Sequence, residues 1–219
     1  MKRKKKEFVI LKPRLPKRSD LSNDMVESFG DEDIFYCKIF ENCTIEDQNA
    51  EKVSFKQVLF RNVDFKKTIL ERVELEDVRF ENCDLSNIEL EGAIIHRAEF
   101  ENCKMVGVNL SGAAIQNTVL DKCNCKYANI RFSLCKRFEA RDSILDSADF
   151  QSSEMVDVRY EATSMRECQM SGTSLCGIDI STCDIEDMIV RMEDIKGAIV
   201  SPLQAVMVAG MVGVVVKDI

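Results

Sequence analysis

Apolar residues recur at every fifth position along most of this 219-residue chain. From Phe55 to Val200, each residue whose number is a multiple of five is apolar, although apolar residues make up only 45% of the sequence. The residue two places before each of these is small or β-branched, with Phe138, Met188 and Glu193 as the clear exceptions. A period of five fits neither an α-helix, with its 3.6 residues per turn, nor a strand, with its period of two. The pattern predicts a chain that turns a corner every five residues and points these two positions inward.

A second period, of twenty residues, indicates four such corners per coil. The four-residue motif Phe-Glu-Asn-Cys begins at Phe40, Phe80 and Phe100. We therefore expect two columns with one residue per coil: Phe40, Phe60, Phe80 and Phe100 in the first, and Asn42, Asn62, Asn82 and Asn102 in the second. Successive coils would lie one strand spacing apart, about 4.8 Å, and their strands would pair in parallel.

Several five-residue motifs resemble the repeat of a known family. Cys83-Asp-Leu-Ser-Asn87, Ala128-Asn-Ile-Arg-Phe132 and Ala148-Asp-Phe-Gln-Ser152 resemble the A(D/N)LXX consensus of the pentapeptide-repeat family. The resemblance covers residues 31–200 in unbroken register. It implies an all-β fold, a right-handed quadrilateral parallel β-helix. Residues 1–30 would then be a basic N-terminal arm and cap.

The C-terminal segment, residues 201–219, predicts a short α-helix and an apolar tail. Ser201 followed by Pro202 is a strong helix start, and the stretch from Gly197 to Val216 carries no charge. One helical stripe then follows at a spacing of three and four residues: Leu203, Val206, Met207, Gly210 and Met211. We expect the helix to run from Pro202 to about Met211. A homodimer through this stripe would bury its apolar surface, and a cap in a monomer and a membrane span are the alternatives.

The C-terminal pattern of Gly197-Ala-Ile-Val200, followed by Gln204-Ala205 and the apolar ending Gly213-Val-Val215, resembles the Qnr and MfpA branch of the pentapeptide-repeat family. Members of that branch end the β-helix with a short helix that dimerises the protein tail to tail. Several Qnr proteins also carry two loops that interrupt the repeat, and no such insertion occurs between Phe55 and Val200. The resemblance implies a DNA mimic that binds a type II topoisomerase, DNA gyrase or topoisomerase IV, and protects it from quinolones.

The charge distribution fits the predicted DNA mimic only in part. Residues 1–20 hold nine basic and two acidic residues, whereas residues 31–200 hold 33 acidic and 20 basic residues. Outward acids fall one or two coils apart immediately after the inward apolar positions: Glu41, Glu81, Glu101, Asp121 and Glu161. A rod about 40 Å long with this charge carries about half that of duplex DNA, which has one negative charge per ~1.7 Å. Residues 102–141, with seven bases and two acids, form a basic belt that a DNA mimic would not need.

We predict from these acids a partner-binding face on a protein that does not itself bind nucleic acid. The alternative is a structural or adaptor solenoid for an unrelated protein partner, because fold does not fix function. The basic arm is either a solubilising tail or a segment that attaches to an acidic surface.

Candidate catalytic chemistry is sparse. The sequence has no Gly-rich phosphate loop, no GxSxG and no supported Cys–His arrangement, so we predict no enzyme, cofactor or metal site. Its one histidine, His96, follows an inward residue and is expected on the surface. Most of the ten cysteines fall in the inward columns and are expected in the core, with Cys176 as the exposed thiol. The start carries no apolar stretch of signal-peptide length, so we expect a reduced, cytoplasmic protein without a membrane anchor.

Overall fold

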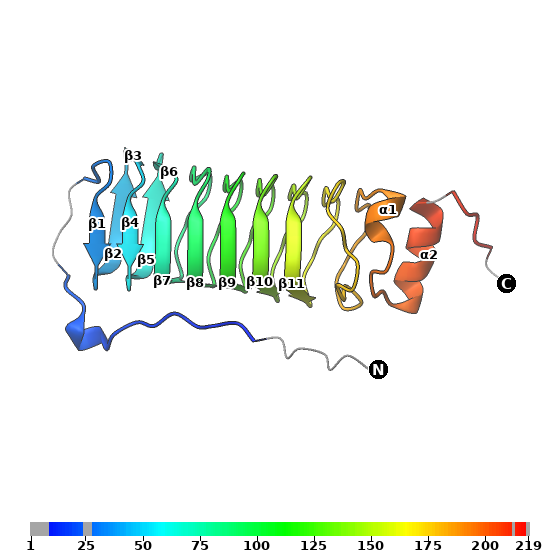
Figure 1. Cartoon of the computed structure of the whole chain (residues 1–219), viewed down its shortest axis with the longest axis horizontal. Helices are drawn as coiled ribbons and strands as arrows, with labels where there is room; N and C mark the ends of the chain where they lie inside the picture. The colour runs from blue at the N-terminus through cyan, green and yellow to red at the C-terminus, as the bar shows by residue number, and fades with distance from the viewer. Residues whose placement is uncertain (1–8, 24–27, 212, 218–219) are drawn as a thin grey trace.

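The chain winds into a parallel β-helix with four five-residue sides per coil (Figure 1). The computed structural model describes residues 9–23, 28–211 and 213–217. Every paired strand residue lies beside the residue twenty positions further on, from Ile34 beside Ser54 to Arg141 beside Glu161. Isolated bridges carry the same register on to Asp179 and Ile199. The solenoid predicted from the five-residue and twenty-residue periods is confirmed.

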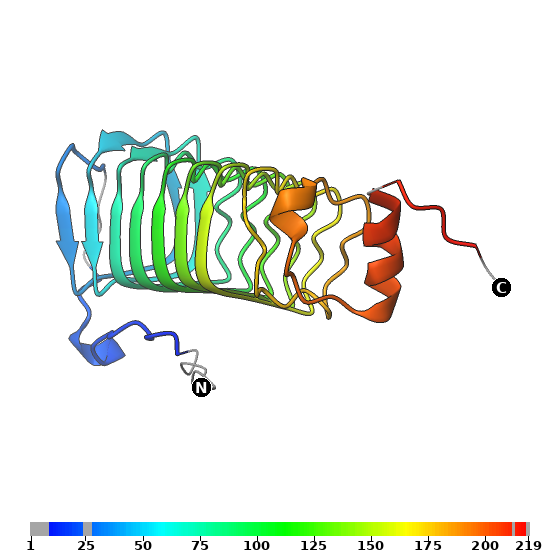
Figure 2. The same ribbon diagram turned by 45° about the vertical axis from the view of Figure 1, so that its right-hand side comes forward.

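From β7 onward, strand structure is concentrated on two neighbouring sides of the coil, where long strands bend around one corner (Figure 2), whereas β2 and β5 in the first coils bend around the next corner. These strands form a nine-stranded sheet, and β3 and β6 form a separate pair. The strands are β1 (Ile34–Tyr36), β2 (Ile39–Glu46), β3 (Asn49–Glu51), β4 (Ser54–Lys56), β5 (Leu59–Lys66), β6 (Ile69–Glu71), β7 (Glu74–Glu81), β8 (Ile94–Glu101), β9 (Ala114–Asp121), β10 (Leu134–Arg141) and β11 (Glu154–Glu161). On the other two sides, single bridges such as that between Asp84 and Lys104 join the coils.

The predicted inward positions form the core. The residues at multiples of five are buried from Phe55 onward, except for Met155, Val190, Ile195 and Val200, which are partly buried and pack against the core. The smaller partners two positions earlier are buried from Val53 through Met188. Even the oversized Phe138 and Met188 point inward, with 2% and 3% of their surface exposed.

The two predicted columns are both present. The rings of Phe40, Phe60, Phe80 and Phe100 stack coil on coil with centroids 4.5 to 5.0 Å apart. At a corner, the amides of Asn42, Asn62, Asn82 and Asn102 form a ladder in which each donates to the preceding one. These asparagines have φ between 52° and 54°, a left-handed conformation that Asn tolerates better than most residues. The repeated Asn therefore serves both the turn and the stacking.

The cysteines are free, and most of them are core residues. Cys83, Cys103 and Cys123 are buried in consecutive coils, and their thiols face backbone carbonyls such as that of Phe100. Cys176 is exposed, as predicted. Cys43 is also exposed, contrary to its place in the inward column, because it lies near the first coil of the solenoid, where no earlier coil covers it.

Two helices close the C-terminal end of the rod. Helix α1 (Met192–Ile195) replaces a regular corner, so Glu193 is exposed at an otherwise inward position and Asp194 is buried in its stead. Helix α2 (Pro202–Met211) has the predicted bounds. Its start is a capping box, in which Gln204 N–H donates to Ser201 Oγ (3.2 Å) and Ser201 N–H donates to Gln204 Oε1 (2.7 Å). The Gln204 amide also donates to the carbonyls of Ile180 and Cys183, which fixes α2 on the last coils.

At the other end, a short 3-10 helix, η1 (Arg18–Asp20), lies within the N-terminal arm. Among the described residues, none of the helices has the length and apolar composition needed to span a bilayer.

Candidate partner-binding surface

The acidic residues predicted to form a face do lie in one column along the rod. On adjacent strands β7, β8 and β9, Glu81 pairs with Glu101, and Glu101 pairs with Asp121. Glu41 and Glu161 occupy the same column, next to Arg61 and Arg141 respectively. The parallel register places these side chains one coil apart, about 4.8 Å.

Most of this column is neutralised by arginines. Arg61 lies between Glu41 (3.4 Å) and Glu81 (2.6 Å). Arg79 contacts Glu101 (2.6 Å) and Arg141 contacts Asp121 (2.7 Å). The hydrogen bonds to these carboxylates are the main reason why the pKa values of Arg79 and Arg141 are raised. The N-terminal part of the column is therefore a ladder of ion pairs, and its net charge is smaller than the acids alone indicate.

Within this column, the uncompensated negative charge lies at the C-terminal end. Glu161 is exposed and has no ion pair with any described residue. The same holds for other exposed acids in these coils, when only the described chain is considered: Asp142, Glu154, Asp157 and Asp187. Glu154, Asp157 and Glu161 all belong to β11. Thus β11 and its neighbours carry the part of the acidic face that is open to a partner.

The described part of the N-terminal arm lies along the rod, across the strands (Figure 1). Arg18 makes a two-point contact with Glu41 (2.9 and 2.8 Å). The main-chain N–H of Arg14 donates to Asp77 Oδ1 (2.9 Å), and that of Leu11 donates to Asn117 Oδ1 (3.3 Å). The arm thus attaches to an acidic surface of its own chain, the second of the two readings that the sequence left open.

Polar residues under the arm are unusually buried. Asp77, Arg97 and Asn117 lie at one corner in consecutive coils, with 6%, 8% and 1% of their surface exposed. Burial acts to raise the pKa of Asp77, but hydrogen bonds from Arg97 and the Arg14 N–H outweigh it, and the pKa is lowered. The same contact raises the pKa of Arg97. Aligning the sequence at its twenty-residue period would have shown this polar column, but not that the arm covers it.

His96 is half-buried rather than freely solvated. Its ring lies against the guanidinium of Arg97, whose Nη1 is 3.0 Å from Nδ1. Burial is the main reason why the pKa of His96 is lowered, and the positive charge of Arg97 adds to the effect. A neutral imidazole next to a permanent cation accepts a hydrogen bond, and among the described residues no carboxylate makes a hydrogen bond to the ring that would activate it.

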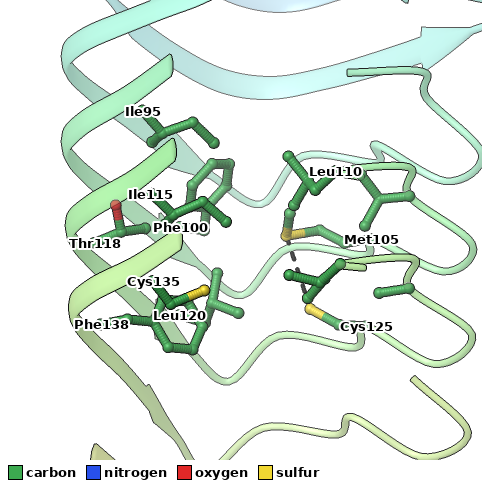
Figure 3. Close-up of a pocket in the computed structure, with 13 residues that line it drawn as sticks. Ile95, Phe100, Met105, Leu110, Ile115, Thr118, Leu120, Cys125, Cys135 and Phe138 are labelled. Carbon is green, nitrogen blue, oxygen red and sulfur yellow. Dashed lines mark hydrogen bonds between the residues drawn. The ribbon is translucent and has the colours of Figure 1, made fainter. Parts of the chain in front are cut away.

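The interior of the rod is filled. Figure 3 shows one internal gap, where Cys125 faces Met105 at 3.9 Å. Its volume is about 20 Å³, and apolar side chains such as Ile115 and Leu120 line it. An apolar gap of this size stays dry and has no room for a substrate. Across the described residues, no group of His, Cys, Asp and Glu side chains is arranged to hold a metal ion.

The predicted apolar stripe of α2 faces outward from the end of the rod. Its members are all exposed: Leu203, Val206, Met207, Gly210 and Met211. Gln204 is buried and Val208 packs on the core, so these two residues mark the face that α2 turns to the solenoid. The tail adds more apolar surface, with 85% of Val215 exposed. A groove of about 580 Å³ runs beside the stripe and is lined by Met188, Met207 and Met211 together with Glu186 and Asp187.

Comparison with known proteins identifies the repeat. Residues 74–112 match the family model for pentapeptide repeats. No curated protein matches the chain.

Solved structures of pentapeptide repeat and fluoroquinolone resistance proteins match the chain at low identity. HetL, a pentapeptide repeat protein involved in heterocyst differentiation regulation in the cyanobacterium Nostoc, is 14% identical, with 78% of this chain and 90% of HetL covered and a TM-score of 0.45. Full-length QnrB1, a plasmid-mediated fluoroquinolone resistance protein, is 14% identical, with 83% and 100% covered and a TM-score of 0.33. Rfr23 from the cyanobacterium Cyanothece is 13% identical, with 61% and 88% covered and a TM-score of 0.26. At these identities and scores, none of the three bears on function.

Proposed function

We propose that this chain, whose residues 74–112 match the pentapeptide-repeat family model, is a non-enzymatic binding protein whose acidic rod occupies the DNA-binding surface of a type II topoisomerase. The observation that carries the proposal is the column of acids aligned one coil apart, which ends in unpaired carboxylates on β11. A regular row of negative charge on a narrow rod is the feature that a DNA-binding groove recognises. Competition would be steric and electrostatic, without covalent chemistry.

The exposed acids without ion pairs define a smaller topoisomerase-binding surface than the whole acidic column does. Glu41, Glu81, Glu101 and Asp121 are paired with arginines, so they contribute little long-range field. Glu161, Asp157 and Asp142 are exposed and unpaired among the described residues. We therefore assign the main electrostatic contact to the coils around β11.

A homodimer through α2 would double this surface. The outward stripe of α2 and the apolar tail leave more apolar area at the end of the rod than a monomer normally exposes. A two-fold axis through α2 would bring the acidic coils of two protomers to either side of the centre. The result would be a longer rod whose most negative part is central.

The dimer is tested by sedimentation of Met207→Glu, which places a charge in the stripe. The matched control is Ala205→Glu, on the same helix but outside the stripe. We expect a monomer for Met207→Glu and a dimer for the control and the wild type. A dimer that survives Met207→Glu would refute the interface.

The topoisomerase function is tested by gyrase supercoiling and quinolone-induced cleavage with the purified protein. We expect inhibition or protection at micromolar concentration, weakened by Glu161→Lys. The control Glu91→Lys makes the same charge change at an exposed position on the opposite side of the coil, about three and a half coils away along the rod. No effect of the wild-type protein, or equal effects of the two variants, would overturn the proposal. The first result would favour the second candidate, an adaptor rod, for which the neutralised column and the basic belt already argue.

A further inference from the structure

The contacts of the N-terminal arm are mainly contacts of its backbone. Arg14 donates its N–H to Asp77 and accepts a hydrogen bond at its carbonyl from Gln57 Nε2 (2.9 Å). Leu11 donates its N–H to Asn117. Every extended peptide carries these main-chain groups, so the surface beneath the arm is suited to more than this one sequence.

The spacing of these contacts matches an extended proline-type helix. From Leu11 to Arg14 the arm advances three residues while the rod advances two coils, from Asn117 to Asp77. Three residues of polyproline II span about 9.3 Å, and two coils span about 9.6 Å. Pro13 and Pro16 favour this conformation, and Lys17 has it, with φ −63° and ψ 148°. The repeat of the arm and the repeat of the rod are therefore commensurate.

At the corner under the arm, hydrogen-bond donors and acceptors alternate from coil to coil, so the acceptors repeat every two coils. We call this column the polar track, and its members in successive coils are Gln57, Asp77, Arg97, Asn117, Arg137 and Asp157. Oxygen acceptors stand in every second coil, at Asp77, Asn117 and Asp157, and N–H donors stand between them. A polyproline-type segment meets an acceptor of the track every three residues.

The arm leaves part of this surface unused. The amide nitrogen of Asn117 is buried and has no hydrogen-bond partner in the described chain. A cavity of about 360 Å³ remains between the arm and the rod, lined by Lys12, Pro13 and Leu15 on one side. Glu99, Glu101 and Asp121 line the other side together with Arg79 and Arg141. The track also continues beyond Asn117 to Arg137 and to the exposed Asp157.

We propose that the polar track is a docking site for an extended, basic, proline-containing segment of a partner protein, and that residues 9–22 occupy it in the free protein as an internal competitor. The basic character follows from the acids beside the track, because Arg18 already pairs with Glu41 and Lys12 lines the same cavity as Glu99 and Glu101. The proline character follows from the shared repeat. This docking site is separate from the proposed topoisomerase-binding surface, and the proposal does not depend on topoisomerase binding.

The test uses a fluorescent peptide with the sequence of residues 9–22, titrated into three full-length proteins: wild type, Arg18→Glu and Lys17→Glu. An attached arm competes at an effective concentration in the millimolar range, so the wild type should bind the peptide weakly. Arg18→Glu opposes Glu41 and should release the arm, and peptide affinity should rise at least tenfold. Lys17→Glu makes the same charge change at an exposed residue whose side chain makes no hydrogen bond or ion pair with the described residues, and it should behave like the wild type.

Two controls examine the peptide and the arm separately. A peptide with glycine in place of Pro13 and Pro16 should bind Arg18→Glu at least tenfold more weakly, because it loses its preformed extension. Hydrogen exchange in the wild type should show protected amides at Leu11 and Arg14, and faster exchange at both in Arg18→Glu.

Equal peptide affinity for the three proteins, or no binding to Arg18→Glu, would overturn the proposal. So would equal binding of the glycine peptide, or unprotected amides in the wild type. If sedimentation showed that Arg18→Glu associates through exchanged arms, the track would belong to a second copy of the chain, and the partner assignment would be wrong. No topoisomerase enters these measurements, so their failure is distinct from failure of the gyrase assay.

Discussion

Arg97 and Asp77 form a two-point ion pair beneath the N-terminal arm, with Nε 2.5 Å from Oδ1 and Nη2 2.7 Å from Oδ2. The two residues lie in neighbouring coils, and the Arg14 N–H donates to the same carboxylate. The buried carboxylate of Asp77 thus joins two coils and the arm.

Removing the guanidinium of Arg97 should destabilise the solenoid strongly. Arg97→Leu leaves Asp77 buried without its partner, which typically costs about 3–5 kcal/mol. Arg72→Leu is the matched control, because Arg72 is exposed and contacts Glu51 at only 3.5 Å; a surface pair contributes about 1 kcal/mol or less. Urea unfolding compares the two variants. Equal losses would show that the buried pair has no special role.

Acid should weaken the fold through the same carboxylate. The pKa of Asp77 is lowered in the folded protein, whereas an unfolded Asp has a value of about 3.9. Its contribution to stability is therefore complete above about pH 4 and is lost as the pH falls through the lower folded value. Urea unfolding at pH 6 and pH 3 should show this loss, and Asp77→Asn should reduce the difference between the two. An unchanged difference in Asp77→Asn would contradict the assignment.

The single histidine reports the same region directly. The pKa of His96 is lowered by burial and then by Arg97, so its NMR titration midpoint should lie below about 6.5. Arg97→Leu removes the positive charge and should raise the midpoint. The urea-unfolded protein supplies the reference value. A wild-type midpoint at or above that reference would mean that the ring is solvated, as the sequence alone suggested.

Thiol reactivity should separate the cysteines by their place in the coil. Cys176 and Cys43 are exposed and should be alkylated in the native protein. Cys135 is buried, and burial raises its pKa to about 12, so it should react only after unfolding. Mass spectrometry of the alkylated peptides makes the comparison. Rapid labelling of Cys135 in the native state would place it outside the core.

The fold was predictable because each coil obeys the same local rule. The Phe40 column, the Asn42 ladder and the start of α2 at Ser201 all follow from spacing and residue type. Helix α1 was not predictable, because Val190, Ile195 and Val200 keep the apolar period although the chain leaves the repeat there.

The surface was predictable only in part. The alignment of Glu81, Glu101 and Asp121 follows from the period. Their neutralisation by Arg79 and Arg141 depends on long side chains that reach between coils, and the period does not report it. The path of the arm depends on contacts such as that between Leu11 and Asn117, 106 residues apart, for which the sequence carries no local signal.

The central claim is that the open acids around β11 compete with DNA for a topoisomerase, and displacement of DNA tests it most directly. Fluorescent DNA bound to gyrase is titrated with the wild-type protein, Glu161→Lys and Glu91→Lys at low and moderate salt. We predict that the wild type and Glu91→Lys displace the DNA, that Glu161→Lys does so several-fold less well, and that salt reduces the difference because it screens exposed charges. Retention of the DNA at micromolar wild-type protein, or equal displacement by the two variants at low salt, would contradict the claim.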